Sequence, residues 1–299
     1  MEDKAYAKIN LSLDVLGRKD NGYHIISTVF ASVDLCDTIT ISKRNDSSIV
    51  ITSDRDSVPL DETNLVYKAS HYMIQEYSLG CGLNIDIKKR IPIGAGLAGG
   101  SSDCATTIKL INRMFDLNID SQELASIGSK FGADVAYCIL GGVMLGSDLG
   151  QKLVRISSMP QCYILIAKPR VSLSTKKIYE QLRADVINDR ELTKIISNTS
   201  DIHNELNPMT ELIKALEEQN IIRLSKVIYN KLEDVSIKLA PKIQDIKDKM
   251  IKLGALNSLM SGSGSSVFGI YTDLDVALQA QKQLANDNEI ESVFVTNPV

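Results

Sequence analysis

The 299-residue sequence contains no tryptophan, only three histidines and five cysteines, and aromatic residues make up 5% of it. Scattered histidines, and cysteines that never form a C-x-x-C pair, argue against a zinc site and against a disulfide framework. An odd number of widely spaced cysteines is instead typical of reduced thiols in the cytoplasm. Acidic residues outnumber basic ones by 37 to 33, a net charge of −4, so the basic surface of a general nucleic-acid binder is missing.

The chain also lacks any run of 18 apolar residues, and its first residues carry charges rather than the apolar segment of a signal peptide. Hydrophobic residues make up 44%, which is enough to fill a core. We therefore expect a cytoplasmic globular protein without a membrane or nucleic-acid partner. The length fits two domains, and a change of pattern near residue 155 predicts domains of residues 1–157 and 158–299.

Hydrophobic spacing predicts an α/β chain that begins with strands. Residues 6–15 alternate between apolar and polar side chains, which indicates a strand with one buried face. Lys8 and Asn10 then share a face, about 7 Å apart. Further strands are expected at 28–35, 38–43, 48–52, 83–87, 162–168, 267–271 and 292–296. Helices are expected at 64–77, after the serines at 101–102, at 121–130 with Ser121 as N-cap, at 193–253 with breaks at Pro208 and Pro241, and at 275–284.

The most informative segment is a glycine-rich loop between an expected strand and an expected helix. It contains a G-x-G-x-x-G pattern, but a helical segment follows where a Rossmann unit needs a strand, and glycine stands where a Walker A loop needs lysine. Glycines and free N–H groups at a helix start still suit an anion, and the serines add hydroxyls for a metal-bound phosphate. A purely structural turn is the alternative. The loop consists of Pro92, Ile93, Gly94, Ala95, Gly96, Leu97, Ala98, Gly99, Gly100, Ser101 and Ser102.

Four other features allow a functional or a structural interpretation. The Ser/Gly run at 261–266 suits either an anion-binding loop or a flexible connection. Asp134, between small and apolar residues just past a helix, needs a basic or hydroxyl partner if it is buried, and is otherwise a turn residue. Lys8 is either a functional cation or a solvent-facing residue of an edge strand. His24, beside Tyr23, suits stacking or hydrogen bonding, or a structural or solvated position.

Taken in order, these segments resemble the motifs of the GHMP family of small-molecule kinases. The three main motifs correspond to residues 7–11, 92–102 and 260–266, and residues 17–24, 61–66, 132–135 and 171–175 add support, so the resemblance spans nearly the whole chain. It implies an α/β (α+β) fold with an N-terminal domain like ribosomal S5 domain 2 and a ferredoxin-like C-terminal domain. An active site between the two domains is expected from the same resemblance.

The resemblance also implies a reaction. ATP would place its phosphates on the loop Pro92–Ser102, with Mg²⁺ and with Ser102 as the metal ligand. Lys8 and Asp134 would flank the acceptor hydroxyl. Tyr23 and His24 would hold a cytosine, which points to a cytidine diphosphate-linked methylerythritol as the small-molecule substrate. The rest of the substrate pocket would be lined by Asn10, Thr175 and Tyr179.

Two alternatives stay open at this point: a kinase of the same family that acts on homoserine or mevalonate, and a non-catalytic ligand-binding relative. Both a monomer and a homodimer fit the sequence. The chain departs from the family pattern at a few positions, which bear on the fine geometry of the substrate pocket and leave Lys8, Asp134 and the phosphate loop in place. The departures are Ile25 for glutamate, Ala136-Tyr137 for Pro-Phe, Lys231 for the aspartate of Asn-Asp-Leu-Glu, and Ser265-Ser266 for Pro-Thr.

Overall fold

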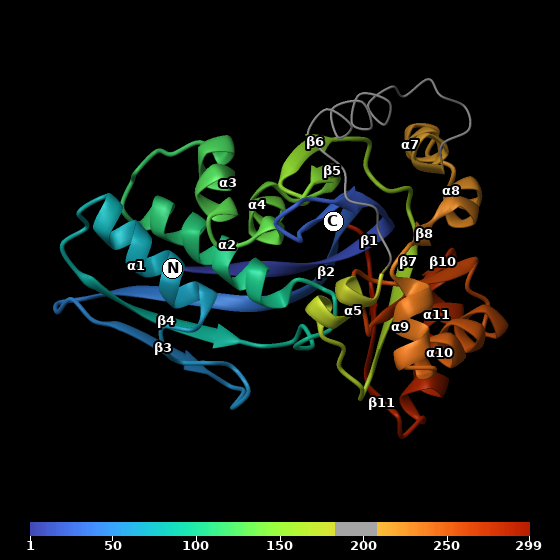
Figure 1. Ribbon diagram of the computed structural model, residues 1–299. Helices are drawn as coiled ribbons and strands as arrows, with labels where there is room; N and C mark the ends of the chain where they lie inside the picture. Colours follow the sequence, from blue (N-terminus) through green and yellow to red (C-terminus); the bar gives the residue numbers. More distant parts are fainter. Residues whose placement is uncertain (183–207) are drawn as a thin grey trace. The chain divides into compact units, whose positions relative to one another are not determined.

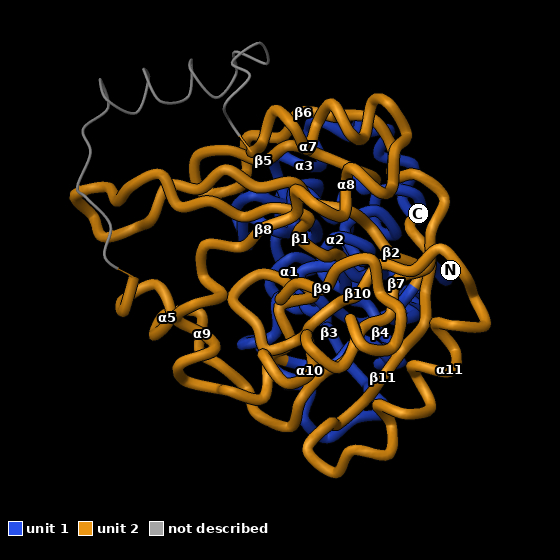
Figure 2. Tube along the Cα trace, turned by 90° about the vertical axis from the view of Figure 1, so that its right-hand side faces the viewer, with its two compact units in different colours: residues 1–7, 35–93, 98–141 blue, residues 8–34, 94–97, 142–299 orange. Residues whose placement is uncertain are grey.

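The computed structural model describes residues 1–182 and 208–299 (Figure 1). The chain divides into two compact units, coloured separately in Figure 2. Unit 1 comprises residues 1–7, 35–93 and 98–141, and unit 2 comprises residues 8–34, 94–97 and the described part of 142–299. Strands β1 (Glu2–Arg18) and β2 (His24–Arg44) contribute residues to both units. The predicted domains 1–157 and 158–299 stay a prediction.

Unit 1 combines strands with a layer of helices. The second half of β2 pairs antiparallel with β4 (Gly82–Lys88), and β4 pairs in parallel with β3 (Ile49–Ser53). Ile39, Ile41, Ile85 and Ile87 are buried, because alternate residues of β2 and β4 face the same side. Figure 1 shows the helices of unit 1 on one side of these strands. They are α1 (Leu65–Glu76), α2 (Gly99–Met114), α3 (Ser121–Ser129) and α4 (Ala133–Leu140).

Local capping explains where two of these helices begin. The Asn64 side chain accepts a hydrogen bond from the Val66 N–H at 2.9 Å and so starts α1. The N-cap of α3 is Asp120, whose carboxylate accepts from the N–H groups of Gln122 and Glu123. The prediction of Ser121 as N-cap was wrong by one residue, because aspartate caps as well as serine does and stands one position earlier.

Strand β2 is longer than predicted. The expected strands 28–35 and 38–43 are one continuous strand, and Cys36 and Asp37 lie within it. Asp37 is fully buried, which is unfavourable for an unpaired carboxylate. The structure resolves the conflict by pairing Asp37 with Lys89.

The main core of unit 2 surrounds an antiparallel sheet. β7 (Tyr163–Pro169) lies between β11 (Ile290–Thr296) and β10 (Val267–Tyr271), and β9 (Asn257–Met260) pairs with the other edge of β10. Helices α10 (Lys242–Lys252) and α11 (Leu274–Ala285) pack against this sheet. Met250, Met260 and Tyr271 are part of the resulting core.

The remaining strands of unit 2 extend β1 and β2. β1 pairs in parallel with β8 (Tyr229–Asn230), and the first half of β2 pairs antiparallel with β5 (Val143–Asp148), which also pairs with β6 (Lys152–Arg155). The other described helices of this unit are α5 (Thr175–Gln181), α7 (Pro208–Glu217), α8 (Ile221–Val227) and α9 (Glu233–Leu239).

The predicted helical tract at 193–253 contains more breaks than its prolines indicate. Pro208 begins α7 and Pro241 immediately precedes α10, as expected for a residue that suits the start of a helix. The tract is also interrupted before α8 and by strand β8. Residues 193–207 of the predicted tract lie outside the described residues. Within the described ranges, each helix is too short or too polar to cross a membrane.

Candidate active site

Lys8 and Asn10 form the buried polar centre of unit 2. The Lys8 ammonium donates to Asn10 Oδ1 at 2.8 Å and to the carbonyl oxygen of Gly96 at 3.1 Å, and Lys8 is only 4% exposed. Asn10 in turn donates to Thr28 Oγ1 at 2.8 Å, so its carbonyl oxygen is held toward the lysine. The period-two spacing had placed both side chains on one face, and this is confirmed. The alternative of a solvent-facing lysine was wrong, because amide and carbonyl oxygens compensate the burial of the charge.

The first glycine loop packs directly on the Ser/Gly run at 261–266. Ser261 Oγ donates to the Gly96 carbonyl at 3.0 Å, and the Ser266 N–H donates to the carbonyl of Ala95 at 3.3 Å. Gly96 has φ +74°, and a Cβ on it would lie 2.2 Å from the carbonyl oxygen of Ser261. Gly262 (φ +58°) lies on the other side of this contact, close to the buried pair. A Cβ on it would lie 3.4 Å from both Lys8 Nζ and Asn10 Oδ1. The run at 261–266 is therefore a packed second loop and not a flexible connection.

Two residues that sequence reasoning missed hold the second loop. Asn230 Nδ2 donates to the carbonyls of Met260 at 2.8 Å and Gly262 at 2.7 Å. Glu233 Oε1 accepts from the Met260 N–H at 2.9 Å, and its other oxygen pairs with Lys247. Both belong to the segment Asn230-Lys231-Leu232-Glu233, in which the sequence pattern singled out only Lys231, as a departure from the family motif. Lys231 is exposed, so that departure leaves the two loop-holding positions intact.

A buried lysine on β7 shapes the segment that leads into α5. Lys168 is fully buried, and its ammonium donates to the carbonyls of Pro169 at 2.7 Å and Val171 at 3.1 Å. The Ser265 hydroxyl also donates to the Val171 carbonyl, and Thr175 Oγ1 lies 2.7 Å from Ser263 Oγ. The predicted substrate residue Thr175 is thus tied to the second loop. A single lysine at the end of an apolar strand gave no signal of this role.

Two of the predicted substrate residues meet through their rings. The rings of His24 and Tyr179 have centroids 5.0 Å apart, at 37°. Partial burial lowers the pKa of His24 below its usual value, and the positive charge of Arg18 adds to the effect. Tyr23, by contrast, is 63% exposed. An exposed ring beside a neutral imidazole is suited to stacking on a planar base.

In unit 1, α2 begins without a capping side chain. Its N-cap, Ala98, is left-handed (φ 58°) and makes no side-chain cap, so the first N–H groups of the helix lack a local side-chain partner. An uncapped helix start of this kind attracts anions. Ser102 is buried, and its hydroxyl donates to the Tyr6 carbonyl at 2.7 Å. That bond uses the Ser102 proton and leaves oxygen lone pairs that fit one ligand position of Mg²⁺.

Asp134 lies in the first turn of α4. The sequence placed it just past a helix, and α3 does end at Ser129, but a second short helix, α4, which was not predicted, starts at Ala133 after a glycine that provides no side-chain cap. A carboxylate in the first turn of a helix is stabilised by the helix dipole. Asp134 is half-buried.

The other departures from the family pattern do not alter these contacts. Ile25, Ala136 and Tyr137 are buried apolar residues of the core. Ser265 is bonded to the Val171 carbonyl, whereas the hydroxyl of Ser266 is buried without a partner.

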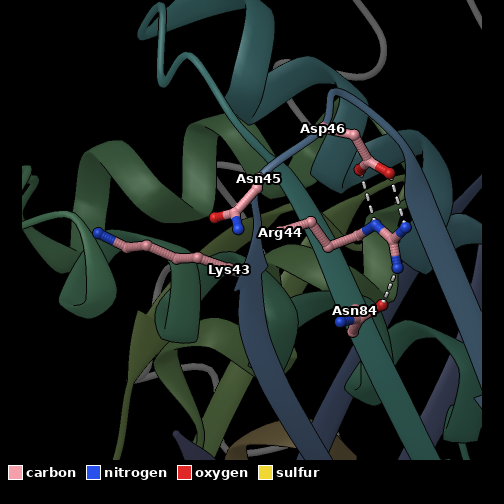
Figure 3. Close-up of a pocket in the computed structure, with 5 residues that line it drawn as sticks. All are labelled: Lys43, Arg44, Asn45, Asp46 and Asn84. Atoms are coloured by element: carbon pink, nitrogen blue, oxygen red, sulfur yellow. Dashed lines mark hydrogen bonds and ion pairs between the residues drawn. The ribbon is translucent and has the colours of Figure 1, made fainter.

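A separate pocket of about 500 Å³ in unit 1 contains none of the predicted site residues (Figure 3). It is lined by Lys43, Arg44, Asn45, Asp46 and Asn84. The Arg44 guanidinium pairs with both oxygens of the Asp46 carboxylate at 2.7 Å and also donates to Asn84. Its charge is thus committed within the pocket, and we assign the pocket no part in the site.

The fold is that of the GHMP kinases, a class of small-molecule kinases. The family described as "GHMP kinases N terminal domain" matches residues 64–142, and "GHMP kinases C terminal" matches residues 212–290. A relative from Lachnospira eligens, named 4-diphosphocytidyl-2-C-methyl-D-erythritol kinase, is 41% identical over 98% of this chain and 96% of its own length. The chain belongs to the family of 4-diphosphocytidyl-2-C-methyl-D-erythritol kinases.

Solved structures agree with this placement. A crystal structure of 4-(cytidine 5'-diphospho)-2C-methyl-D-erythritol kinase is similar to this chain with a TM-score of 0.80 and 26% identity, covering 100% of this chain and 99% of the other. A homoserine kinase from Cytophaga hutchinsonii has a TM-score of 0.70 at 22% identity, covering 97% and 94%. The second similarity concerns the fold alone. The predicted GHMP kinase fold is confirmed.

Substitution of Gly96 tests the contact between the two loops. We expect Gly96→Ala to destabilise the protein by about 2 kcal/mol or more, because a left-handed alanine is strained and its Cβ meets the Ser261 carbonyl. Gly100→Ala is the matched control, since a Cβ at this helical position meets nothing within 4 Å and alanine favours helix by up to about 1 kcal/mol. Urea unfolding of both variants measures the difference, and equal midpoints would contradict the packing described here.

Proposed function

We propose that this small-molecule kinase transfers the γ-phosphoryl group of ATP to the 2-hydroxyl of 4-diphosphocytidyl-2-C-methyl-D-erythritol. The observation that carries the proposal is the 41% identity, over nearly the full length of both chains, to a relative named for that substrate. The buried Lys8–Asn10 pair beside the first glycine loop and the His24–Tyr179 contact support it. In this reading the protein acts in the non-mevalonate route to isoprenoid precursors, and its cysteine pattern supports a cytoplasmic location.

Phosphoryl transfer depends on alignment and on charge stabilisation more than on covalent chemistry by the protein. Asp134 accepts or orients the proton of the acceptor hydroxyl. Lys8 lowers the pKa of that hydroxyl and stabilises the negative charge that develops on it. Asn10 Oδ1 and the Gly96 carbonyl accept hydrogen bonds from the ammonium and hold it in place.

The ATP phosphates are assigned to the loop 92–102. Its glycines allow close approach of the backbone, and the uncapped start of α2 offers N–H donors. Mg²⁺, when bound through the phosphates with Ser102 as a protein oxygen ligand, supplies positive charge to the transferring group. Within the described residues there is no cluster of three or more His, Cys, Asp or Glu side chains able to hold a metal, which supports a cation carried mainly by the nucleotide.

The acceptor is assigned to the residues around His24. Tyr23 and His24 stack on or bond to the cytosine, Tyr179 supports the imidazole, and Thr175 and Asn10 line the rest of the pocket. A substrate panel tests this assignment with Mg-ATP and cytidylated and uncytidylated alcohols, including homoserine and mevalonate. We expect transfer only to the cytidylated substrate. Transfer only to an uncytidylated alcohol would favour another GHMP kinase, and nucleotide binding without transfer would favour a non-catalytic relative.

Replacement of the assigned base tests the mechanism. We expect Asp134→Asn to lower kcat about 100-fold or more, with little change in the KM for ATP, because an amide does not accept the hydroxyl proton. Asp275→Asn is the matched control, since Asp275 is also in the first turn of a helix, α11, and is exposed. Steady-state kinetics of the two variants measure the effect. Near-normal turnover of Asp134→Asn would refute the role of Asp134.

The lowered pKa of His24 predicts a pH effect on substrate binding. At pH values between the lowered pKa of the folded protein and the ordinary value of 6.5, the imidazole is neutral. It becomes charged, beside Arg18, only on further acidification. We expect the KM for the cytidylated substrate to rise on acidification below pH 6.5, as the neutral ring is lost. His24→Phe keeps an aromatic ring but removes the titration, so its KM should vary less between pH 5 and 8. His71→Phe, whose histidine stacks on Tyr67 in α1, is the control. Identical acid limbs in wild type and His24→Phe would contradict the assignment.

A further inference from the structure

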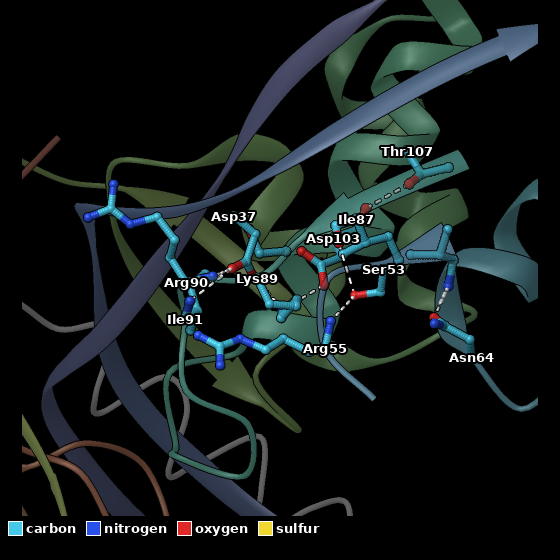
Figure 4. A network of polar contacts seen from close by, with 12 residues as sticks. Asp37, Ser53, Arg55, Asn64, Ile87, Lys89, Arg90, Ile91, Asp103 and Thr107 are labelled. Atoms are coloured by element: carbon cyan, nitrogen blue, oxygen red, sulfur yellow. Dashed lines mark hydrogen bonds and ion pairs between the residues drawn. The ribbon is translucent and has the colours of Figure 1, made fainter. Parts of the chain in front are cut away.

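Three charged side chains are buried together in unit 1 (Figure 4). Asp37, Asp103 and Lys89 are 0%, 4% and 6% exposed, respectively. The Lys89 ammonium donates to Asp37 Oδ2 and, at 2.7 Å, to Asp103 Oδ2. We call these residues the buried triad. None of them belongs to the groups assigned above to phosphoryl transfer or to substrate binding.

The buried triad holds the chain on both sides of the phosphate loop. Asp37 Oδ1 accepts hydrogen bonds from the N–H groups of Arg90 at 2.5 Å and Ile91 at 2.8 Å, the two residues directly before Pro92. Asp103 directly follows Ser102, the last residue of the loop, and lies in the first turns of α2. Lys89 directly follows β4. Its ammonium links the segment before the loop, which Asp37 holds, to the segment after the loop, which contains Asp103.

Lys89 also lies next to the start of α2. A Cβ on Gly99, the first residue of the helix, would be 3.3 Å from the Lys89 Nζ and 3.1 Å from the Ile91 side chain. The uncapped helix start thus rests on the triad and on Ile91 without an intervening side chain. A shift of Lys89 or of Asp103 would move the N–H groups assigned to the ATP phosphates.

Stability is a poor explanation for the triad. Desolvation of buried ions offsets much of their mutual attraction, and apolar replacements of a whole buried ion pair are often neutral or stabilising. Asp103 Oδ1 is buried without a hydrogen-bond partner, which adds to the cost of the arrangement. Apolar contacts are not directional, whereas charged hydrogen bonds fix the distance and angle between the segments that they join.

We propose that Asp37, Lys89 and Asp103 are positioning residues that hold the two ends of the phosphate loop in its ATP-binding conformation. The proposal rests on the proposed function of that loop. It assigns the triad no contact with substrate and no proton transfer. Loss of the triad should therefore weaken the binding of nucleotide and leave the binding of the acceptor alcohol nearly unchanged.

The decisive experiment compares affinity and stability in the full-length protein. We expect Lys89→Met and Asp103→Leu each to raise the Kd for Mg-ATP, measured by calorimetry, at least tenfold, and to raise the KM for ATP in parallel. The KM for the acceptor should change less than twofold. Asp103→Asn, which keeps an oxygen acceptor for Lys89, should recover most of the affinity. Lys109→Met, at a half-buried lysine later on α2, is the matched control and should bind ATP as the wild type does.

A double variant separates positioning from stability. Lys89→Met/Asp103→Leu replaces the ion pair with apolar side chains, while Asp37 keeps its two backbone N–H donors. We expect its urea midpoint to exceed that of Lys89→Met while its Kd for ATP stays raised at least tenfold. Wild-type ATP affinity in this double variant would overturn the proposal. If the wild type binds ATP but transfers no phosphate to the cytidylated alcohol, the proposed function fails and these affinities still decide the role of the triad.

Discussion

The carbonyl oxygen of Gly96 is the point on which the rest of the unit 2 site depends. It accepts hydrogen bonds from the Lys8 ammonium at 3.1 Å and from Ser261 Oγ at 3.0 Å, so one backbone group orients the assigned catalytic lysine and joins the two loops. The arrangement requires glycine, because the residue is left-handed and the neighbouring backbone leaves no room for a Cβ. Asn230 and Glu233 then hold the partner loop from the side of β8 and α9. Two loops far apart in the sequence are thereby joined by hydrogen bonds on both sides of the contact.

The parts of this site that were predictable from the sequence are those whose signal is local. Alternation along β1 placed Lys8 and Asn10 on one face, and the density of glycine at 94–100 indicated a loop at a helix start. Both are short-range consequences of backbone geometry, with a period of two in a strand and freedom of φ at glycine. The order of elements from β3 to α3 followed for the same reason, since each carries its own hydrophobic period, whereas α4, β5, β6, α5 and β9 were not predicted.

What could not be predicted depends on partners distant in the sequence. The expected strands on either side of Asp37 form one strand in the structure, where Lys89, 52 residues later, pairs with the buried carboxylate. Asn230 has no distinctive context, and its role follows only from the carbonyls that it meets 30 and 32 residues later. The start of α4 was missed because the residue before it is a glycine without a side-chain cap, so nothing local marks the helix. In each case the missing information is a tertiary contact.

Lys8 and Lys89, two of the three buried lysines in the described residues, show how the same group is suited to different tasks by its partners. Lys89 is held by two carboxylates, which place opposing charge on both sides of it and make it a link between segments. Lys8 is held by an amide oxygen and a backbone carbonyl, which fix its position but add no opposing charge. An amide or carbonyl oxygen of this kind orients an ammonium without itself contributing an opposing charge. A protein with a net charge of −4 can in this way bind an anionic nucleotide, since what matters is the sign of the charge at the loop and not its sum over the surface.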